Sequence, residues 1–322
     1  MPYVPTRAGY EYAIQAPRAV DPRLHALLSC FTRPAGQADP PRVLVVAAHP
    51  DDETIGVGGM FPRLGERLQV LHVTDGAPRH RRQWGRQEFR AWEDYAAQRH
   101  REVECALAVA GLDAADVCRR MEVMDSEVSL NLIPVTRRLV EILDEAQPEV
   151  VITHPYEGGH TDHDATAFAI RAAVTLLARE GATTPAVAEF TSYHNEGGEK
   201  VVNRFLPWDG APVTDVALTR EEKDMKRRMY DCFVTQYGVL RDMPIRLERY
   251  RPAPCYDFTQ APHAGRLRYE RYPLGIRGKH WRQLAADAME HLGLNRHWDA
   301  PRKQHQDPLT GLVPRLASLV SG

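Results

Sequence analysis

Cysteine is scarce in this chain and its spacing shows no pattern. The 322 residues include only five cysteines, and no two of them form a C-x-x-C pair: Cys30, Cys105, Cys118, Cys232 and Cys255. A secreted disulfide scaffold and a thiolate zinc site both need closely spaced or paired cysteines. We therefore expect neither a disulfide framework nor a thiolate zinc site, and a cytoplasmic location fits this cysteine usage.

Long apolar runs and a strong net charge are also missing. Residues 1–19 lack the apolar core of a signal peptide, and no run approaches the length that a transmembrane helix needs. The formal net charge is -2, which offers no bulk attraction to nucleic acid or to an anionic membrane. We expect a protein with no transmembrane segment and no nucleic-acid partner.

Short apolar segments alternate with helical patterns from residue 42 to about residue 190. Expected strands lie at 43–48, 69–74, 120–124, 150–153 and 187–192, and expected helices at 86–110, 132–146 and 165–178. Strands and helices that alternate at these lengths favour an α/β fold. The prediction is a Rossmann-like, doubly wound and mostly parallel sheet with helices on both faces.

The two ends of the chain carry weaker signals. Residues 1–40 contain several prolines and resemble an N-terminal arm, whereas 238–280 is proline-containing and loop-rich. A strand at 213–218 and helices at 219–230 and 281–292 are expected between and after these loops. We predict one domain over 41–322, with a core at about 42–190 and a loop-rich C-terminal elaboration at about 191–322.

The first motif stands at the end of the first apolar strand. The strand runs directly into His49-Pro50-Asp51-Asp52-Glu53, and open α/β sheets bind their ligands at the carboxyl ends of strands. A histidine and a carboxylate three residues apart can both face one metal ion. The neighbouring carboxylate is then left for proton transfer.

The second motif follows another apolar strand. Residues 154–163 read His-Pro-Tyr-Glu-Gly-Gly-His-Thr-Asp-His and open a helix. Two parallel strands that each present histidines and acids at one edge of a sheet indicate a single metal site. Histidine nitrogens with one carboxylate suit zinc, although other divalent first-row ions are not excluded by affinity. Three protein ligands leave a position for water, whose pKa zinc lowers to roughly 7.

Together the two motifs resemble those of the PIG-L/LmbE-like zinc deacetylases, a family that removes acetate from N-acetylglucosaminyl conjugates. The resemblance covers about residues 42–180. It implies zinc as cofactor with His49, Asp52 and His163 as ligands, Asp51 as general base and His160 as the residue that stabilises the oxyanion. For Asp51, the alternative from the residues alone is a helix N-cap.

Four further residues are expected to contact substrate. Asp125 resembles the family's acid that binds sugar hydroxyls, with an ordinary cap or turn as its alternative. Arg82 lies in a basic stretch that reads either as an anion clamp or as a solvated loop. Tyr156 and Glu157 are expected to line the mouth, since the glycines after them keep the backbone close. Members of the family often have a tyrosine next to the Gly-His pair, where this chain has a glycine.

These observations predict a zinc-dependent hydrolase that removes acetate from a small-molecule N-acetyl sugar conjugate; homo-oligomerisation stays open. One alternative keeps the site but changes the amide, giving an amidase for a thiol-sugar conjugate or an N-acyl antibiotic or glycoside intermediate. Another is a non-catalytic, Rossmann-like nucleotide-binding module. The glycines of residues 55–60 give that reading little support, because they lack the G-x-G-x-x-G spacing. Tight packing of a helix on the sheet explains them better.

Overall fold

The computed structural model describes residues 21–34, 36–79, 84, 89–272 and 275–294. Its centre is a seven-stranded sheet with the order β3-β2-β1-β4-β5-β9-β8. The strands are β1 (Val43–Ala47), β2 (Leu68–Thr74), β3 (Cys118–Val123), β4 (Val150–Thr153), β5 (Ala186–Phe190), β8 (Thr214–Ala217) and β9 (Leu247–Pro252). The first five are parallel, and β9 and β8 add to the edge in antiparallel fashion. The predicted mostly parallel α/β sheet is confirmed.

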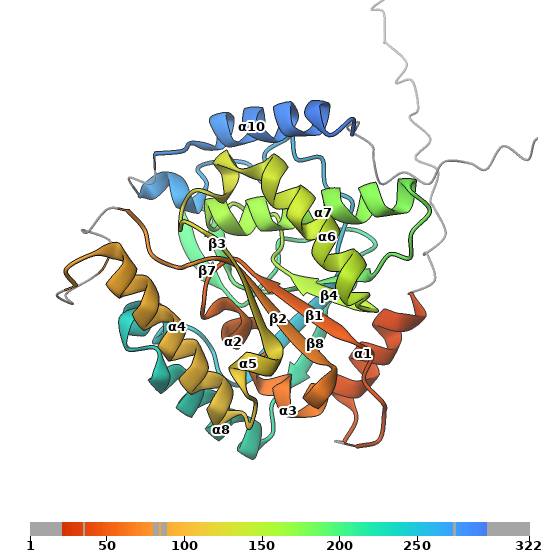
Figure 1. Cartoon of the computed structure of the whole chain (residues 1–322), viewed down its shortest axis with the longest axis vertical. Coiled ribbons are helices and arrows are strands. Elements are labelled where there is room, and N and C mark those ends of the chain that lie inside the picture. The colour runs from red at the N-terminus through yellow and green to blue at the C-terminus, as the bar shows by residue number, and fades with distance from the viewer. Residues whose placement is uncertain (1–20, 35, 80–83, 85–88, 273–274, 295–322) are drawn as a thin grey trace, which may run out of the picture.

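Helices cover both faces of this sheet (Figure 1). One face packs against α1 (Pro22–Thr32), α2 (Asp52–Val57), α3 (Phe61–Leu64), α4 (Trp92–Val109), α5 (Ala114–Val117) and α8 (Arg220–Cys232). The other packs against α6 (Leu132–Ala146), α7 (Thr161–Arg179) and α10 (Gly278–His291). Strand residues such as Val45 and Val46 point alternately into these two cores. Both faces of β1 are therefore buried, as its unbroken apolar run requires.

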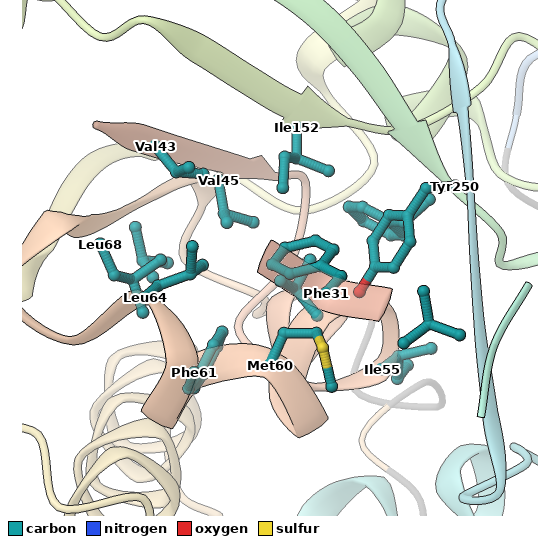
Figure 2. Close-up of a cluster of buried hydrophobic side chains, with 14 of the residues drawn as sticks. Phe31, Val43, Val45, Ile55, Met60, Phe61, Leu64, Leu68, Ile152 and Tyr250 are labelled. Carbon is teal, nitrogen blue, oxygen red and sulfur yellow. The ribbon is translucent and has the colours of Figure 1, made fainter. Parts of the chain in front are cut away.

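The first of these cores shows how the N-terminal segment joins the domain. Phe31 of α1 packs 4.9 Å from the ring of Tyr250 on β9, among side chains from β1, α2 and α3 (Figure 2). Asp21 caps α1 through the backbone N–H of Arg23 at 2.9 Å. Part of the segment expected to be an arm is thus a helix with an apolar face buried in the core.

The C-terminal third contains more regular structure than its sequence indicated. A hairpin of β6 (Tyr193–Glu196) and β7 (Glu199–Val202) follows β5, and β9 lies inside the stretch expected to be loops. Short elements complete the chain: α9 (Tyr237–Leu240), η1 (Gly58–Met60), η2 (Gly65–Arg67), η4 (Val128–Leu130), η5 (Val234–Gln236) and η6 (Arg268–Arg271). Strand β9 was not predicted because prolines surround it, but β9 itself includes only Pro252, at its last position.

A disulfide joins α4 to α8 through Cys105 and Cys232, whose Cα atoms are 5.8 Å apart. The scattered cysteines gave no indication of it, because its two halves are 127 residues apart in sequence. The sequence analysis expected no disulfide framework and did not predict this single bond. Such bonds are rare in a reducing cytosol, so the cytoplasmic expectation does not account for it. None of the described helices combines the length and apolar character needed to cross a bilayer.

Candidate metal centre

The site lies at the carboxyl end of β1, where the order in which strands are added to the sheet reverses: β2 and β3 lie on one side of β1, and β4 and β5 on the other. Strand β1 pairs with β2 on one side and with β4 on the other, in register from Val43 with Val150. This is a topological switch point, at which the strand ends leave a crevice. His49 follows β1 and His154 follows β4, so the two motifs that were predicted to meet do meet.

Three donor atoms from these motifs form a compact triangle. His49 Nδ1 lies 3.0 Å from Asp52 Oδ2, His163 Nε2 lies 3.3 Å from the same oxygen, and the two histidine nitrogens are 3.3 Å apart. Tetrahedral coordination with bonds of about 2.0–2.1 Å places neighbouring donors about 3.3–3.4 Å apart. All three residues are buried. Their donor atoms fit a divalent ion of the size of zinc.

The orientation of His49 is fixed from its far side. Its Nε2 faces Asp162 Oδ2 at 3.3 Å and Asp125 Oδ1 at 3.5 Å, so a proton on Nε2 leaves the Nδ1 lone pair directed into the triangle. Asp162 in turn accepts the backbone N–H groups of Ser126 at 2.6 Å and Val128 at 3.2 Å. A carboxylate that holds a histidine in this way is a common partner of metal-binding histidines.

The charges around the triangle favour a cation there. Burial alone would lower the pKa of His49, yet the carboxylates of Asp125, Asp162 and Asp52 raise it well above its ordinary value. Burial alone would raise the pKa of Asp52, yet His163 and His154 hold it well below its usual range. The acids therefore stabilise positive charge at this position, and a bound divalent cation supplies that charge.

Asp51 stands beside the triangle without joining it. It occupies the N-cap position of α2 but its side chain makes no capping hydrogen bond, so the helix-cap alternative does not describe it. Its Oδ1 instead lies 3.2 Å from Nη2 of Arg99, a buried residue of α4. Burial raises the pKa of Asp51 to about 6, with Arg99 acting in the opposite direction. A carboxyl with such a pKa can exchange protons near neutral pH.

His160 caps the start of α7 with its imidazole ring. Its Nδ1 accepts the backbone N–H of Asp162 at 3.2 Å, so a proton on the neutral ring resides on Nε2. Burial lowers its pKa to about 4, with the charge of His49 as the next cause. The ring stands edge-on to His49, with their centroids 4.6 Å apart. A neutral imidazole with an N–H to donate therefore borders the metal site.

The four expected substrate contacts lie in different environments. Asp125 borders the site, where it faces His49 and accepts the hydroxyl of Ser126 at 3.0 Å. Arg82 lies outside the described residues. Tyr156 was expected at the mouth but is buried, with its hydroxyl on the Gln260 carbonyl at 2.8 Å.

Glu157 was also expected at the mouth. The structure buries it, with Oε1 accepting the backbone N–H of Leu206 at 2.7 Å and lying 3.2 Å from Arg251. Its other oxygen faces His194 Nδ1 at 3.3 Å. Both oxygens therefore have partners within the protein, and a substrate-binding role for Tyr156 or Glu157 stays a prediction.

Three residues at the site were not singled out from the sequence. His154 accepts the backbone N–H of Ala48 through Nε2 at 2.9 Å and stacks on His163 at 4.0 Å. The sequence could have pointed to Arg99, because it is a charged residue in the buried stripe of α4, where an apolar residue is expected. Tyr193 carries none, since it is brought to the site by the β6–β7 hairpin.

Tyr193 packs on the second motif. Its ring centroid lies 5.6 Å from that of His163, and a Cβ added at Gly159 would collide with its carbonyl oxygen. Burial raises its pKa, and Asp52 is the next cause. A tyrosine in its neutral, donating form therefore stands beside the metal site.

Residues 44–174 match the family described as PIG-L, GlcNAc-PI de-N-acetylase. The chain carries a PIG-L-family domain. This confirms the resemblance inferred from the two motifs, and the matched residues include both of them.

Named relatives of this PIG-L domain are deacetylases. The 1D-myo-inositol 2-acetamido-2-deoxy-alpha-D-glucopyranoside deacetylase of Mycobacterium sp. (strain KMS) is 33% identical over 158 residues, which are 42% of this chain and 50% of the relative. The probable N-acetyl-alpha-D-glucosaminyl L-malate deacetylase 2 of Bacillus anthracis is 27% identical over 155 residues, or 47% and 67% of the two chains. The chain thus spans about half the length of the mycobacterial relative.

The solved structures to which this one is similar are more distant in sequence. A deacetylase of the teicoplanin biosynthesis pathway has a TM-score of 0.49 at 18% identity, covering 66% of this chain and 97% of its own. The N,N'-diacetylchitobiose deacetylase of Pyrococcus horikoshii has a TM-score of 0.44 at 22% identity, covering 70% and 84%.

Proposed function

We propose that the protein is a metal-dependent hydrolase that removes acetate from an N-acetylated sugar of the N-acetylglucosamine type. The observation that carries the proposal is the donor triangle of His49, Asp52 and His163 with a buried, non-ligating carboxylate beside it. The names of the mycobacterial and Bacillus relatives support the choice of an N-acetylated sugar as substrate.

His49, Asp52 and His163 would hold the metal, and zinc is the ion that their donor set suits best. A bound ion of this kind acidifies a water molecule and polarises an amide carbonyl. Asp125 and Asp162 keep the proton of His49 on Nε2, away from the metal side of the ring. A metal-binding histidine offers a nitrogen lone pair to the ion, and with its proton on Nε2 the ring of His49 would offer Nδ1.

Asp51 is the proposed general base. Its carboxylate would take a proton from the attacking water and later return it to the departing amine, which a group with a pKa near 6 can do in both directions. Arg99 holds the carboxylate through Oδ1 at 3.2 Å. The second oxygen, Oδ2, then remains for the proton transfer.

His160 is the proposed donor to the oxyanion. Because Nδ1 is occupied by the N–H of Asp162 and the pKa is lowered to about 4, the ring would act as a neutral imidazole that donates from Nε2. Oxyanion donors act on charge that develops only in the transition state. Asp125, at the rim of the triangle, is the proposed acceptor for sugar hydroxyls.

Acetate release tests this function directly. Protein stripped with a chelator is reconstituted with zinc, cobalt or manganese and incubated with a panel of N-acetylhexosamine conjugates, both nucleotide-linked and free. We expect acetate release that depends on added metal and is lost in Asp51→Asn. Activity that persists in the chelated protein, or that is absent from every acetylated substrate, would contradict the proposal.

The same panel separates the rival functions. Matched N-acetyl and longer N-acyl substrates distinguish a deacetylase from an amidase that acts on thiol-sugar conjugates or antibiotic intermediates. Nucleotide binding without acetate release would instead favour a binding module. The structure gives the module little support, because the glycines of residues 56–59 are buried in α2 and η1 under Phe190 and Leu218 and do not form an open phosphate-binding loop.

A further inference from the structure

A second group of reactive side chains involves β2, β3 and α2 and takes no part in the proposed hydrolysis. Cys118, the first residue of β3, places Sγ 3.4 Å from Nδ1 of His72 on β2. The opposite ring nitrogen, Nε2, lies 2.8 Å from Oε2 of Glu53 on α2. A thiol, an imidazole and a carboxylate from three different elements therefore form one line of contacts, the arrangement that activates nucleophilic cysteines.

The imidazole in this line is held in its charged form. His72 and Glu53 are fully buried. Burial alone would lower the pKa of His72, but Cys118 and Glu53 outweigh it and raise that pKa to about 10. Glu53 is kept in place by the hydroxyl of Thr54, which donates to Oε1 at 2.7 Å.

One further titratable group faces His72 from the helix packed above it. His100 of α4 is half-buried, and burial with the charge of Arg120 lowers its pKa to about 4. It is therefore neutral at physiological pH and leaves the positive charge on His72. A fixed imidazolium beside a sulfur atom stabilises the thiolate, which is the nucleophilic form of cysteine.

Cys118 lies at the margin of the first core and is partly exposed. Its strand, β3, is at the edge of the sheet, and among the described strands it pairs with β2 alone. The residue is half-buried, whereas Cys30 is buried and Cys255 is exposed. Cys30 donates to the Arg63 carbonyl at 3.8 Å, and Cys255 is contacted by Arg171 at 3.7 Å. The chain thus contains two internal comparators for the same reaction.

We propose that Cys118 is a reactive thiol that undergoes exchange with small disulfides, activated by His72 and Glu53. Its sulfur attacks one sulfur of the disulfide and forms a mixed disulfide, while the S–S bond of the reagent breaks and the other half leaves as a thiolate. Cys118 is oxidised and the departing half is reduced. The thiol proton passes to the free Nδ1 of a neutral His72 ring, and the imidazolium that results, with Glu53 at Nε2, keeps it.

The deciding measurement compares each cysteine in the folded and the urea-unfolded protein. An aromatic disulfide such as 5,5′-dithiobis(2-nitrobenzoate) is added at pH 7 without reductant, which leaves the Cys105–Cys232 bond intact, and modified peptides are quantified by mass spectrometry. We expect Cys118 to react faster in the folded chain, by roughly tenfold. Cys30 should react far more slowly when folded. A Cys118 rate equal to or below its unfolded value would overturn the proposal, because the contact would then be a thiol that merely satisfies a buried ring nitrogen.

Two variants test the source of the activation. In His72→Gln the folded rate of Cys118 should fall to its unfolded value or below, whereas the neighbouring control His100→Gln should keep the fast rate. Circular dichroism establishes that each variant is folded. If His72→Gln does not fold, the comparison of folded and urea-unfolded wild type still tests whether the fold activates Cys118. A folded His72→Gln protein that retains the fast rate would refute the role of the imidazole.

Discussion

At the scale of single residues, the metal site depends on which atom of each side chain points inward. Two neighbouring acids, Asp51 and Asp52, acquire opposite properties: the pKa of one is raised to about 6 by burial, and that of the other is held well below its usual range by two histidines. His163 and His154 produce this division because they act on Asp52, whereas Arg99, which contacts Asp51, offsets only part of the effect of burial on that residue. The division separates the proposed base from the ligand.

His163→Ala should lose most of its bound zinc while the fold survives. The substitution removes one of three donor atoms from the triangle, and the remaining two atoms leave the ion open to water. Metal analysis after gel filtration, together with a circular dichroism spectrum, measures both properties. Full zinc occupancy at unchanged affinity would remove His163 from the ligand set.

Asp51→Asn should keep its metal but lose about 10² or more in kcat, as expected for a positioned acid–base group. In the wild type, kcat/KM should fall as the pH drops through about 6, because the base is then protonated. A bound cation moves this midpoint downward. The residual activity of Asp51→Asn should not show this fall in kcat/KM at acidic pH. Near wild-type kcat in Asp51→Asn would mean that the base lies elsewhere.

Two tyrosines offer a matched pair. Tyr193→Phe removes a hydroxyl near the metal site and should lower kcat by roughly tenfold or more at nearly unchanged KM, because a donor to developing charge acts in the transition state. Tyr156→Phe removes a hydroxyl bound to Gln260 in the core. It should lower the melting temperature and leave kcat alone. The reverse result, with kcat changed only in Tyr156→Phe, would favour the predicted substrate contact of Tyr156.

At the scale of elements, the C-terminal third determines how α2, the helix that begins with Asp52, is seated. Lys226 of α8 is fully buried and donates to the Ile55 carbonyl at 2.8 Å, while Glu248 of β9 accepts the N–H of Gly59 at 2.8 Å. Tyr250 adds a hydrogen bond to the Gly56 carbonyl at 3.1 Å. The elaboration therefore supports the proposed ligand helix from below.

Gly59→Ala tests this packing. A Cβ at Gly59 would lie 2.6 Å from Leu218 and 3.0 Å from the Glu248 carboxylate, so we expect a loss of about 1–3 kcal/mol in the free energy of unfolding. Gly238→Ala in α9 is the control, since no atom of the described chain lies within 4 Å of its Cβ position. It should be neutral or slightly stabilising. Urea denaturation of both variants measures the difference, and equal stability would contradict the packing argument.

The parts of this arrangement that local patterns encode were predictable. The apolar run of β1 and the residue types of His49–Asp52 and His160–His163 identified the sheet edge and the proposed metal donors, because strand ends and ligand chemistry depend on short spacings. Arg99 and Tyr193 were not found, since their roles come from a helix and a hairpin packed against the site. The predicted helix at 165–178 actually begins at Thr161, because His160 caps it with its ring. A histidine is not among the residues that signal a helix start.

At the scale of the whole molecule, one sheet joins the family-matched core to the rest of the chain. Strands β9 and β8 extend the parallel sheet beyond β5, with Ala188 opposite Pro252 and Phe190 opposite Tyr250. Helix α1 packs from the N-terminal side against the same core. The segments at both ends therefore share a hydrophobic core with residues 44–174, which makes cooperative unfolding the expectation for the described chain.

The disulfide between α4 and α8 should add measurably to the stability of this unit without changing the chemistry. Its halves are 127 residues apart, and a cross-link that closes a loop of this size typically stabilises by about 2–4 kcal/mol through the unfolded state. We expect α4 and the segment that follows α8 to stay in contact after reduction, because Thr235 of η5 donates its N–H to Glu102 at 3.0 Å and Gln236 donates to Tyr95 at 2.8 Å. Reduction with a phosphine should thus lower the melting temperature by roughly 5–10 °C, with kcat unchanged well below it. The double variant Cys105→Ser, Cys232→Ser should show the lower melting temperature in both conditions. Equal melting temperatures for reduced and oxidised wild type would show that the bond contributes nothing.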